Sequence, residues 1–251
     1  MIPLERQKTI LNLIQQNEVM SIQDLCQIFD VSYMTIWRDI NLLEKEGKVV
    51  TVSGGVRASE RLAVEPSHEI KGGLNAAEKS SIAEIACEKI PKNACIYLDA
   101  GTTVLALAKK IAHRSDLTII TNDLIIACYL VQNSQAELIH TGGRICKENS
   151  SAIGDITAKT LRNFIIDIAF VSASSWNLRG ISTPDENKVP VKEAIAEVSN
   201  KRYLLSDSSK YGKVATYIAL PITAFDAIFT DKALPKNTLT ELKNLGVSVY
   251  N

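Results

Sequence analysis

The chain has 251 residues, of which 46% are hydrophobic and 22% are charged, with a formal net charge of zero at pH 7. This length allows one large domain, or a small domain and a larger one, with a buried core. Charged residues interrupt the N-terminal apolar positions and no apolar run approaches membrane-spanning length, so we expect a cytoplasmic protein with no membrane partner.

Two amphipathic helices are predicted at the N-terminus. Apolar residues recur at helical spacing over residues 4–16, and Asn17 ends this first helix. The sequence Ser21-Ile22-Gln23-Asp24 is an S-x-x-D capping signature, which predicts the start of a second, short helix. Leu25 and Phe29 lie on its buried face.

A third helix is predicted after the turn at residues 29–31. Ser32 is a good N-cap, and Ile36, Ile40 and Leu43 recur at helical spacing as the buried face. The opposite face carries side chains that can bind phosphates or read bases, namely Tyr33, Thr35, Trp37, Arg38 and Asn41. This arrangement is typical of a DNA recognition helix.

A small hairpin is predicted next. Gly47 closes the third helix, and residues 48–52 and 53–56 form the hairpin. Three helices and a hairpin make a winged helix-turn-helix, whose third helix enters the major groove of double-stranded operator DNA while the hairpin meets the backbone or the minor groove. The expected DNA-binding residues are Ser32, Tyr33, Thr35, Trp37, Arg38, Asn41, Lys48 and Arg57.

Alternatives to this interpretation stay open. Residues 1–57 carry six basic side chains against seven acidic ones, so DNA binding needs a locally focused basic surface, and a protein-interaction module is the alternative. Trp37 can contact a sugar or a thymine methyl, or it can be a partly buried aromatic that supports the helix. Arg38 and Asp39 can also form a pair that orients the arginine and leaves the aspartate without a direct DNA role.

The helical periodicity fails between residues 57 and 75, where prolines and glycines occur among charged residues. We therefore expect a winged helix-turn-helix domain over residues 1–57, a linker over 58–74 and a second domain over 75–251. The linker can hold a short extended or helical piece around residues 62–70.

In the second domain, short apolar runs alternate with helical patterns. Helices are predicted over residues 76–90, 103–112, 123–131, 155–163 and 189–200, and strands over residues 95–98, 117–120, 136–140, 168–172, 203–206, 217–220 and 227–229. This alternation predicts an α/β fold with a mostly parallel sheet covered on both faces. Ligands of such sheets bind at the carboxyl ends of the strands.

Polar or glycine-containing turns follow four of these strands. The first is Asp99-Ala100-Gly101-Thr102-Thr103, in which the glycine, the N-terminus of the next helix and two hydroxyls form a phosphate cradle. The others are Thr121-Asn122-Asp123, Thr141-Gly142-Gly143-Arg144 and Ser206-Asp207-Ser208-Ser209-Lys210. One such turn alone commonly serves as a cap, and Asp99 and Asp207 can be general bases, hydroxyl acceptors or caps. Four turns on one rim predict a site for a phosphorylated polyol.

The five cysteines, Cys26, Cys87, Cys95, Cys128 and Cys146, are odd in number and widely spaced among apolar neighbours. They include no CxxC pair, and no cluster of histidines accompanies them. We therefore expect buried free thiols, and neither a metal site nor a cofactor.

Short motifs in both domains match one known pattern. Those in the first domain are Arg6, Ile10, Ile14, Val31-Ser32, Thr35-Ile36, Arg38-Asp39 and Gly54-Gly55. Those in the second are Asp99, Gly101-Thr102-Thr103, Thr121-Asn122, Gly142-Gly143, Gly154, Asp167, Gly180, Lys192, Asp207-Ser208-Ser209-Lys210 and Thr230-Asp231. Through these motifs the chain resembles the DeoR family of bacterial transcriptional regulators. Trp37 departs from the family pattern, which usually has a second basic residue there, and residues 174–179, which fit it less closely, are candidates for selecting the sugar.

The resemblance implies a regulator, usually a repressor of a carbohydrate-utilisation operon, that senses a phosphorylated sugar. It also implies a sensor domain similar in fold to sugar-phosphate isomerases of the ribose-5-phosphate isomerase kind. Gly101, Thr102 and Thr103 would hold the phosphate. Asp99 and Asn122 would hold the sugar hydroxyls, while Lys192 and Lys210 would neutralise charge. The expected effector-binding residues are these seven together with Gly142, Gly143 and Asp207.

Two classes of function fit the sequence. A regulator of this kind needs a homo-oligomer, a dimer or a tetramer, because one short recognition helix gives too little affinity and specificity. The alternative is a sugar-phosphate isomerase or deaminase with an appended DNA-binding module. No isolated acid–base pair points to catalysis, and an enzyme has no use for the first 57 residues, so we expect a regulator and not an enzyme.

Overall fold

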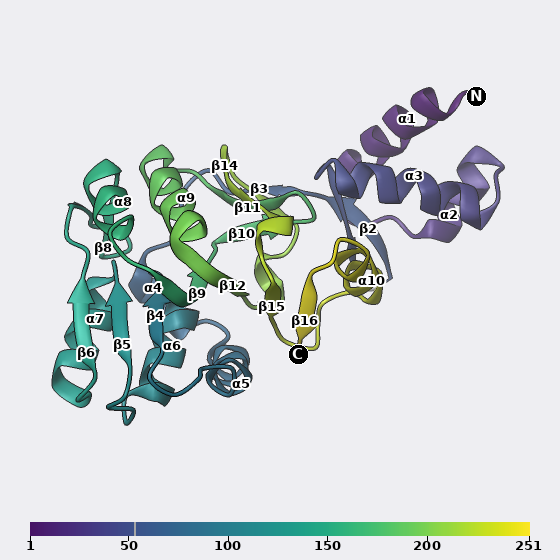
Figure 1. The fold of residues 1–251 in the computed structure, drawn as a ribbon. Coiled ribbons are helices and arrows are strands. Elements are labelled where there is room, and N and C mark those ends of the chain that lie inside the picture. Colours follow the sequence, from purple (N-terminus) through teal and green to yellow (C-terminus); the bar gives the residue numbers. More distant parts are fainter. Residues whose placement is uncertain (53) are drawn as a thin grey trace.

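A computed structural model describes residues 1–52 and 54–251 (Figure 1). Ser53, which falls in the predicted hairpin, lies outside the described residues. A small N-terminal unit is joined by a connector to a larger α/β unit. Within the described ranges, no helix is both long and apolar enough to cross a membrane.

The N-terminal unit is a winged helix-turn-helix, as predicted. It consists of α1 (Pro3–Gln16), α2 (Ile22–Phe29), α3 (Tyr33–Lys45) and a hairpin of β1 (Val49–Val52) and β2 (Gly55–Ala58). The hydroxyls of Ser21 and Ser32 accept hydrogen bonds from the N–H groups of Asp24 and Thr35 and so cap α2 and α3. The shared core consists of Ile10, Ile14, Met20, Ile22, Leu25, Ile36, Ile40, Leu43, Val49 and Val56.

The larger unit is built on a seven-stranded sheet in which every pairing is parallel. The strand order is β16-β15-β12-β9-β4-β5-β6. In chain order these strands are β4 (Cys95–Leu98), β5 (Thr118–Thr121), β6 (Glu137–His140), β9 (Ile166–Ser172), β12 (Ser199–Leu205), β15 (Ala227–Phe229) and β16 (Ser248–Tyr250).

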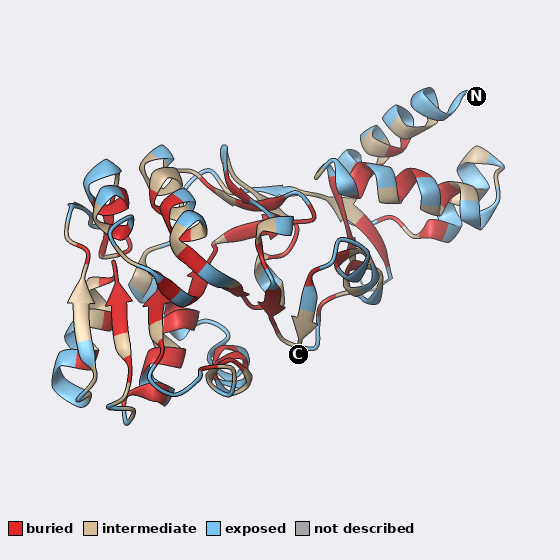
Figure 2. Ribbon diagram, viewed as in Figure 1, coloured by how far each residue is buried: buried red, intermediate tan, exposed pale blue. Residues whose placement is uncertain are grey.

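Alternation along the strands gives the sheet two apolar faces. Ile96 and Leu98 of β4 pack in a cluster with α5 (Ala76–Cys87), α6 (Thr102–Ile111) and α7 (Leu124–Asn133). Tyr97, between them, packs in the cluster on the opposite face with α8 (Asp155–Leu161), α9 (Val189–Val198) and α10 (Lys236–Asn244). Figure 2 shows buried central strands between helices whose outer sides are exposed. The predicted α/β fold is therefore confirmed.

One predicted strand belongs to a different sheet. Residues 217–220 lie in β14 (Tyr217–Pro221), which pairs with β11 (Gly180–Thr183), and β11 pairs with β10 (Ser175–Asn177), in a separate antiparallel sheet. Part of β14 is exposed, whereas strands of a covered parallel sheet are buried on both faces. Neither α10 nor β16 is predicted from the sequence; α10 is mostly polar, with Leu239 and Leu242 among polar side chains.

The chain enters the parallel sheet near its centre. From β4 it runs outward through β5 and β6, then returns to β9 on the other side of β4 and continues through β12, β15 and β16. The connections that follow β4 and β9 cover opposite faces of the sheet. An open parallel sheet has a crevice at such a switch point, so a ligand site is expected at the carboxyl ends of β4 and β9.

The connector is folded onto the larger unit. Its β3 (Glu60–Arg61) pairs with β13 (Lys213–Val214), and the Ser67 hydroxyl caps its α4 (His68–Gly73). The predicted extended or helical piece is thus present as a strand and a helix. The N–H of His68 donates to the carbonyl of Glu148 (3.0 Å), which lies between β7 (Arg144–Cys146) and β8 (Ser151–Ile153).

A buried carboxylate joins the N-terminal unit to the larger one. Glu44 of α3 is 1% exposed. It accepts hydrogen bonds from the N–H and the hydroxyl of Thr51 (2.9 Å each), the hydroxyl of Tyr211 (3.0 Å) and the amide of Asn237 in α10 (3.3 Å). Burial and the Glu44 charge raise the pKa of Tyr211, which therefore keeps the proton that it donates. These bonds fix α3 against the larger unit.

All five cysteines are free, as expected. The expectation that they are buried is wrong, because Cys128 is exposed and the other four are half-buried. Cys87, Cys95 and Cys146 lie at the ends of their elements, where neighbouring elements cover them incompletely.

We expect Tyr211→Phe to weaken the attachment of the N-terminal unit. The change removes one donor to a buried carboxylate and should lower the free energy of unfolding by about 1–3 kcal/mol. Tyr217→Phe, at an exposed position of β14, is the matched control and should be nearly neutral. Urea unfolding followed by circular dichroism measures both, and equal stability of the two variants would contradict the role of Tyr211.

Candidate functional site

A pocket opens beside the carboxyl ends of β4 and β9. It encloses about 630 Å³ of space between side chains, part of which is open solvent at its mouth. Its charged lining residues are Lys71, Lys188, Lys192, Lys210, Glu65 and Asp99. These four lysines are paired with three carboxylates, because Asp207, just outside the lining, pairs with Lys210; one positive charge is left over, so the pocket suits an anionic ligand.

Asp99 connects the two central strands beside this pocket. Its carboxylate, 1% exposed as a residue, accepts a hydrogen bond from the N–H of Ser172 (2.8 Å) and pairs with the ammonium of Lys192. Lys192 also donates to the carbonyl of Ser172 (3.0 Å). The structure therefore brings two of the predicted residues, Asp99 and Lys192, into direct contact at the switch point.

The N-terminus of α6 presents uncharged donors. The hydroxyls of Thr102 and Thr103 are buried and have no hydrogen-bond partner within residues 1–52 and 54–251, and Thr102 lines the pocket. A ligand oxygen would supply the missing partner for Thr102. A Cβ at Gly101 would lie 2.2 Å from the Ser172 hydroxyl oxygen, so only glycine fits there. The Gly101 N–H is already bound to Asp123 (3.1 Å) and is therefore not available to a ligand.

Four predicted effector-binding residues lie outside the pocket lining: Thr103, Gly142, Gly143 and Asp207. The two glycines follow the edge strand β6 and contact α8. The Thr157 hydroxyl donates to the carbonyl of Gly142 (2.8 Å), and a Cβ at Gly143 would lie 2.2 Å from the same hydroxyl oxygen. These glycines therefore permit the close approach of α8.

Asp207, which lies outside the lining, and Asn122, which lies within it, are both bound by the protein itself. Asp207 pairs with Lys210 (3.3 Å) and accepts a hydrogen bond from the amide of Asn75 (3.0 Å), beside a neighbouring cavity. Asn122 lines the pocket, but its amide accepts from the Tyr97 hydroxyl (2.7 Å) and donates to the carbonyl of Ala152 (2.9 Å). Both side chains thus stabilise the walls around the pocket.

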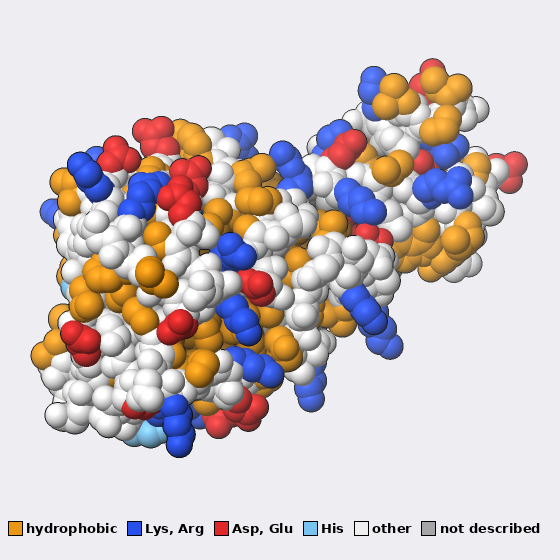
Figure 3. Space-filling model, in the orientation of Figure 1, with side chains coloured by type: hydrophobic (Ala, Val, Ile, Leu, Met, Phe, Trp, Pro, Cys, Tyr) orange, Lys and Arg blue, Asp and Glu red, His pale blue; other side chains and the backbone are white. Residues whose placement is uncertain are grey.

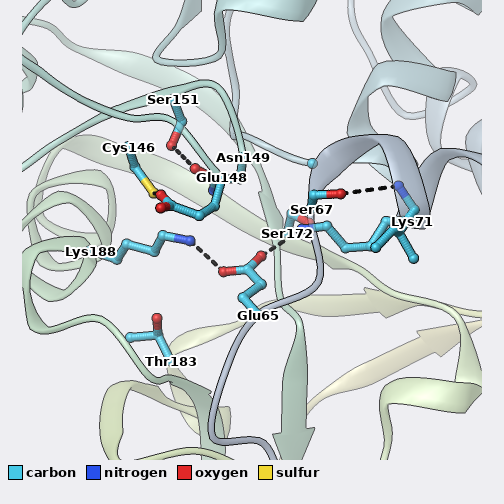
Figure 4. Close-up of polar contacts among 12 residues, drawn as sticks. Glu65, Ser67, Lys71, Cys146, Glu148, Asn149, Ser151, Ser172, Thr183 and Lys188 are labelled. Atoms are coloured by element: carbon cyan, nitrogen blue, oxygen red, sulfur yellow. Dashed lines mark hydrogen bonds and ion pairs between the residues drawn. The ribbon is translucent and has the colours of Figure 1, made fainter.

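Three charged residues of the pocket were not predicted: Glu65, Lys71 and Lys188. Figure 4 shows Glu65 reaching from the connector toward Lys188, and its carboxylate pairs with both Lys71 (2.6 Å) and Lys188. Lys188 ends the 3-10 turn η1 (Glu186–Lys188), four residues before Lys192. Residues four apart share one side of a helix, so this spacing was the available signal.

The Glu65 side chain is ionised at neutral pH. Burial alone would raise the pKa of Glu65, but the charges of Lys188 and Lys71 outweigh burial and lower the pKa to about 2. The connector therefore places a carboxylate anion inside the pocket at neutral pH.

The recognition face predicted on α3 is only partly exposed. Tyr33 and Arg38 are exposed, whereas Thr35 and Trp37 are half-buried. Trp37 packs against the core of the N-terminal unit and edge-to-face against Tyr33, with ring centroids 6.0 Å apart. This geometry favours the interpretation of Trp37 as a supporting aromatic. The hydroxyls of Ser32 and Thr35 lie 2.9 Å apart and share a hydrogen bond at the start of the helix.

Asp39 does not pair with Arg38, so that alternative is wrong. Asp39 is 2% exposed and accepts hydrogen bonds from Arg6 (2.6 Å) and Gln7 (2.8 Å), which hold α1 against α3. Arg38 lies on the exposed side of α3 instead. Figure 3 shows lysine and arginine side chains scattered among uncharged ones on this unit.

The last three predicted DNA-binding residues already have partners. Asn41 is half-buried and accepts a hydrogen bond from the Asn237 amide (3.2 Å), so it belongs to the contact with the larger unit. Lys48 is exposed and pairs with Glu46 (2.6 Å). Arg57 is half-buried in β2 and makes a long hydrogen bond to the carbonyl of Ala58 (3.4 Å).

Comparison with known proteins bears on both units. The family model described as the DeoR C-terminal sensor domain matches residues 74–232, and the one described as the DeoR-like helix-turn-helix domain matches residues 6–61. The chain belongs to the DeoR family. The resemblance seen in the sequence is therefore confirmed.

Individual relatives of this DeoR-family chain agree. It is 52% identical over 250 residues to an HTH-type transcriptional regulator of Haemophilus influenzae, with 100% of this chain and 98% of the relative covered. It is 30% identical over 239 residues to the glycerol-3-phosphate regulon repressor of Escherichia coli K12, with 95% and 94% covered. The family and these relatives are transcriptional regulators, so the expectation of a regulator rather than an enzyme is confirmed.

Among solved structures, the DeoR-family chain is similar to ribose 5-phosphate isomerase A from Methanocaldococcus jannaschii. The TM-score is 0.38 and the sequence identity 15%, with 53% of each chain covered. This likeness concerns the fold alone.

The Glu65 ion pairs should make stability depend on pH in one direction. Because the folded-state pKa is lowered from 4.5 to about 2, the ionised carboxylate contributes stability above pH 4.5. This contribution, about 3 kcal/mol, is lost as the pH falls from 4.5 toward 2. Urea unfolding of the wild type and Glu65→Gln should therefore differ most at pH 7 and converge in acid. A difference that stays constant with pH would contradict the ion-pair assignment.

Proposed function

We propose that this chain is a transcriptional repressor of a carbohydrate-utilisation operon, controlled by a phosphorylated sugar bound in the pocket at the β4–β9 switch point. In this proposal residues 1–57 bind operator DNA, residues 58–74 connect, and residues 75–251 bind the effector and form the oligomer. The protein acts in the cytoplasm, where operator DNA lies.

The charge of the pocket carries the proposal. Its four lysines outnumber the three carboxylates that pair with them, and beside them lies the hydroxyl of Thr102, which has no partner within the described residues. A phosphate monoester has a charge of about −1.5 to −2 at neutral pH, which complements this lining. The glycerol-3-phosphate regulon repressor, 30% identical, has a phosphorylated polyol in its name, and this supports the same class of ligand here.

The operator would be read by a pair of modules. A two-fold oligomer presents two α3 helices to successive major grooves, so a palindromic operator with half-sites about one helical turn apart is expected. In each module α3 exposes two cations, Arg38 and Lys45, of which Lys45 pairs with Glu241 of the larger unit (3.0 Å). The other predicted DNA-binding residues would then hold α3 in position in the major groove.

Thermal unfolding of the full-length protein against sugar phosphates and their unphosphorylated parents tests the effector. A ligand that binds only the folded state raises the unfolding midpoint as its concentration rises. We expect at least one phosphorylated sugar to do so and its parent not to. Unchanged midpoints across the panel would overturn the proposal of a sugar-phosphate sensor.

The same measurement on Thr102→Val locates the phosphate. The variant keeps the side-chain shape but loses a donor to a charged group, so the effector should bind roughly 10-fold or more weakly. Thr230→Val, which also removes a buried, unpartnered hydroxyl but lies outside the pocket lining, is the matched control. Equal effector affinity in the two variants would exclude Thr102 from the site.

Arg38→Ala tests the DNA-binding assignment. Loss of a direct contact should weaken operator binding by about 1–3 kcal/mol while sugar-phosphate binding stays intact. The operator is selected from random-sequence DNA with the wild type, and affinities are measured by fluorescence anisotropy at fixed salt. Arg162→Ala, at an exposed arginine just after α8, is the matched control. DNA affinity equal to that of the control would remove Arg38 from the interface.

A further inference from the structure

We propose that Glu65 is an internal ligand: it fills an anion subsite formed by Lys188 and by Lys71 of the connector's own helix α4, and an anionic group of the effector displaces it and so loosens the connector over residues 62–68. The inference rests on the proposed effector site and adds to it a second subsite and a means of communication with the DNA-binding module.

The origin of the Glu65 carboxylate sets it apart from the other acids near the pocket. Lys192 and Lys210 are paired with Asp99 and Asp207, both of which lie within two residues of the end of a strand of the sheet. Lys188 also belongs to the sheet domain, yet its partner comes from the connector, 123 residues away in sequence. A carboxylate on a connector can leave the pocket without unfolding the sheet.

Removal of Glu65 would expose a ready-made anion site. The side chains of Lys71, Lys188 and Glu65 are only 11%, 12% and 14% exposed. Two shielded ammonium groups need an anion, because an unpaired buried charge is costly. A phosphate or carboxylate group of the effector offers the same charge-assisted hydrogen bonds as Glu65, so the exchange keeps both lysines paired.

The connector is held on both sides of Glu65. On one side β3 pairs with β13, and the N–H of Leu62 donates to the carbonyl of Val214 (2.8 Å). On the other side the N–H of His68 donates to the carbonyl of Glu148 (3.0 Å). β3 follows the wing strand β2 after one residue. Displacement of Glu65 would therefore loosen the segment that sets the position of the wing.

Isothermal titration calorimetry of the full-length protein with inorganic phosphate at pH 7.5 tests the subsite. Because Glu65 competes for the two lysines, Glu65→Gln should bind phosphate about 10-fold or more tightly than the wild type. Glu69→Gln, at an exposed position of α4, is the matched control and should match the wild type. The double variant Glu65→Gln, Lys188→Met should lose this increase in phosphate affinity. The same titration with acetate identifies the anionic group of the effector. If Glu65→Gln raises the affinity for acetate alone, the subsite binds a carboxylate; if it raises the affinity for phosphate, the subsite binds a phosphate.

A second measurement needs no variant. Saturating phosphate, compared with chloride at equal ionic strength, should speed amide hydrogen exchange at Leu62 and His68 in the wild type, because both amides are held while Glu65 is bound. Unchanged or slower exchange there would overturn the displacement. No gain in phosphate or acetate affinity in Glu65→Gln, or a gain that survives Lys188→Met, would overturn the subsite. If a sugar phosphate still stabilises the wild type in that case, the sensor proposal stands and only this inference fails.

Discussion

The Asp99 carboxylate bridges the two strands from which the chain runs in opposite directions across the sheet. β4 and β9 are neighbours, and beyond their last paired residues Asp99 binds the N–H of Ser172 and the ammonium of Lys192. The first bond closes the gap between the two strand ends, and the second attaches α9 to them. A buried carboxylate requires such partners, because without them its desolvation would be uncompensated. The pocket wall at the ends of β4 and β9 and Lys192 of α9 take their positions from this contact.

A second buried carboxylate, Glu44, has the same role between the two units. It receives donors from the wing, from Tyr211 and from α10, and so links the recognition helix to two separate parts of the sensor domain. Tyr211 directly follows Lys210, which lines the pocket. One short backbone segment therefore contacts both the pocket in which we propose that the effector binds and the helix that we assign to DNA binding. If a ligand moves this segment, the movement reaches α3 through a few direct contacts and needs no long chain of intermediate residues.

Local patterns in the sequence predicted most of the fold. Strands 95–98 and 227–229 have the predicted bounds, and Ser21 and Ser32 are the caps that their spacing indicates. The failures are those that local patterns cannot resolve. An apolar run at 217–220 indicates a strand without specifying its sheet, and the glycines at 142–143 indicate a turn without showing that α8 approaches it. Glu65 looks like an ordinary linker residue, because its partner Lys188 lies 123 positions away.

Gly212 lies where the wing meets the sensor domain, directly after Tyr211. Its φ is +80°, and a Cβ there would come within 2.7 Å of the Val50 side chain of β1. The Val50 side chain therefore packs directly against the backbone of Gly212, although the two residues belong to modules that are separate in sequence. In a chimeric regulator that joins a foreign DNA-binding module to this sensor domain at the connector, a different residue at the position of Val50 would not pack correctly against Gly212. To exchange operator preference between family members, the chimera has to keep Val50 opposite Gly212 while the helix that reads the DNA is exchanged.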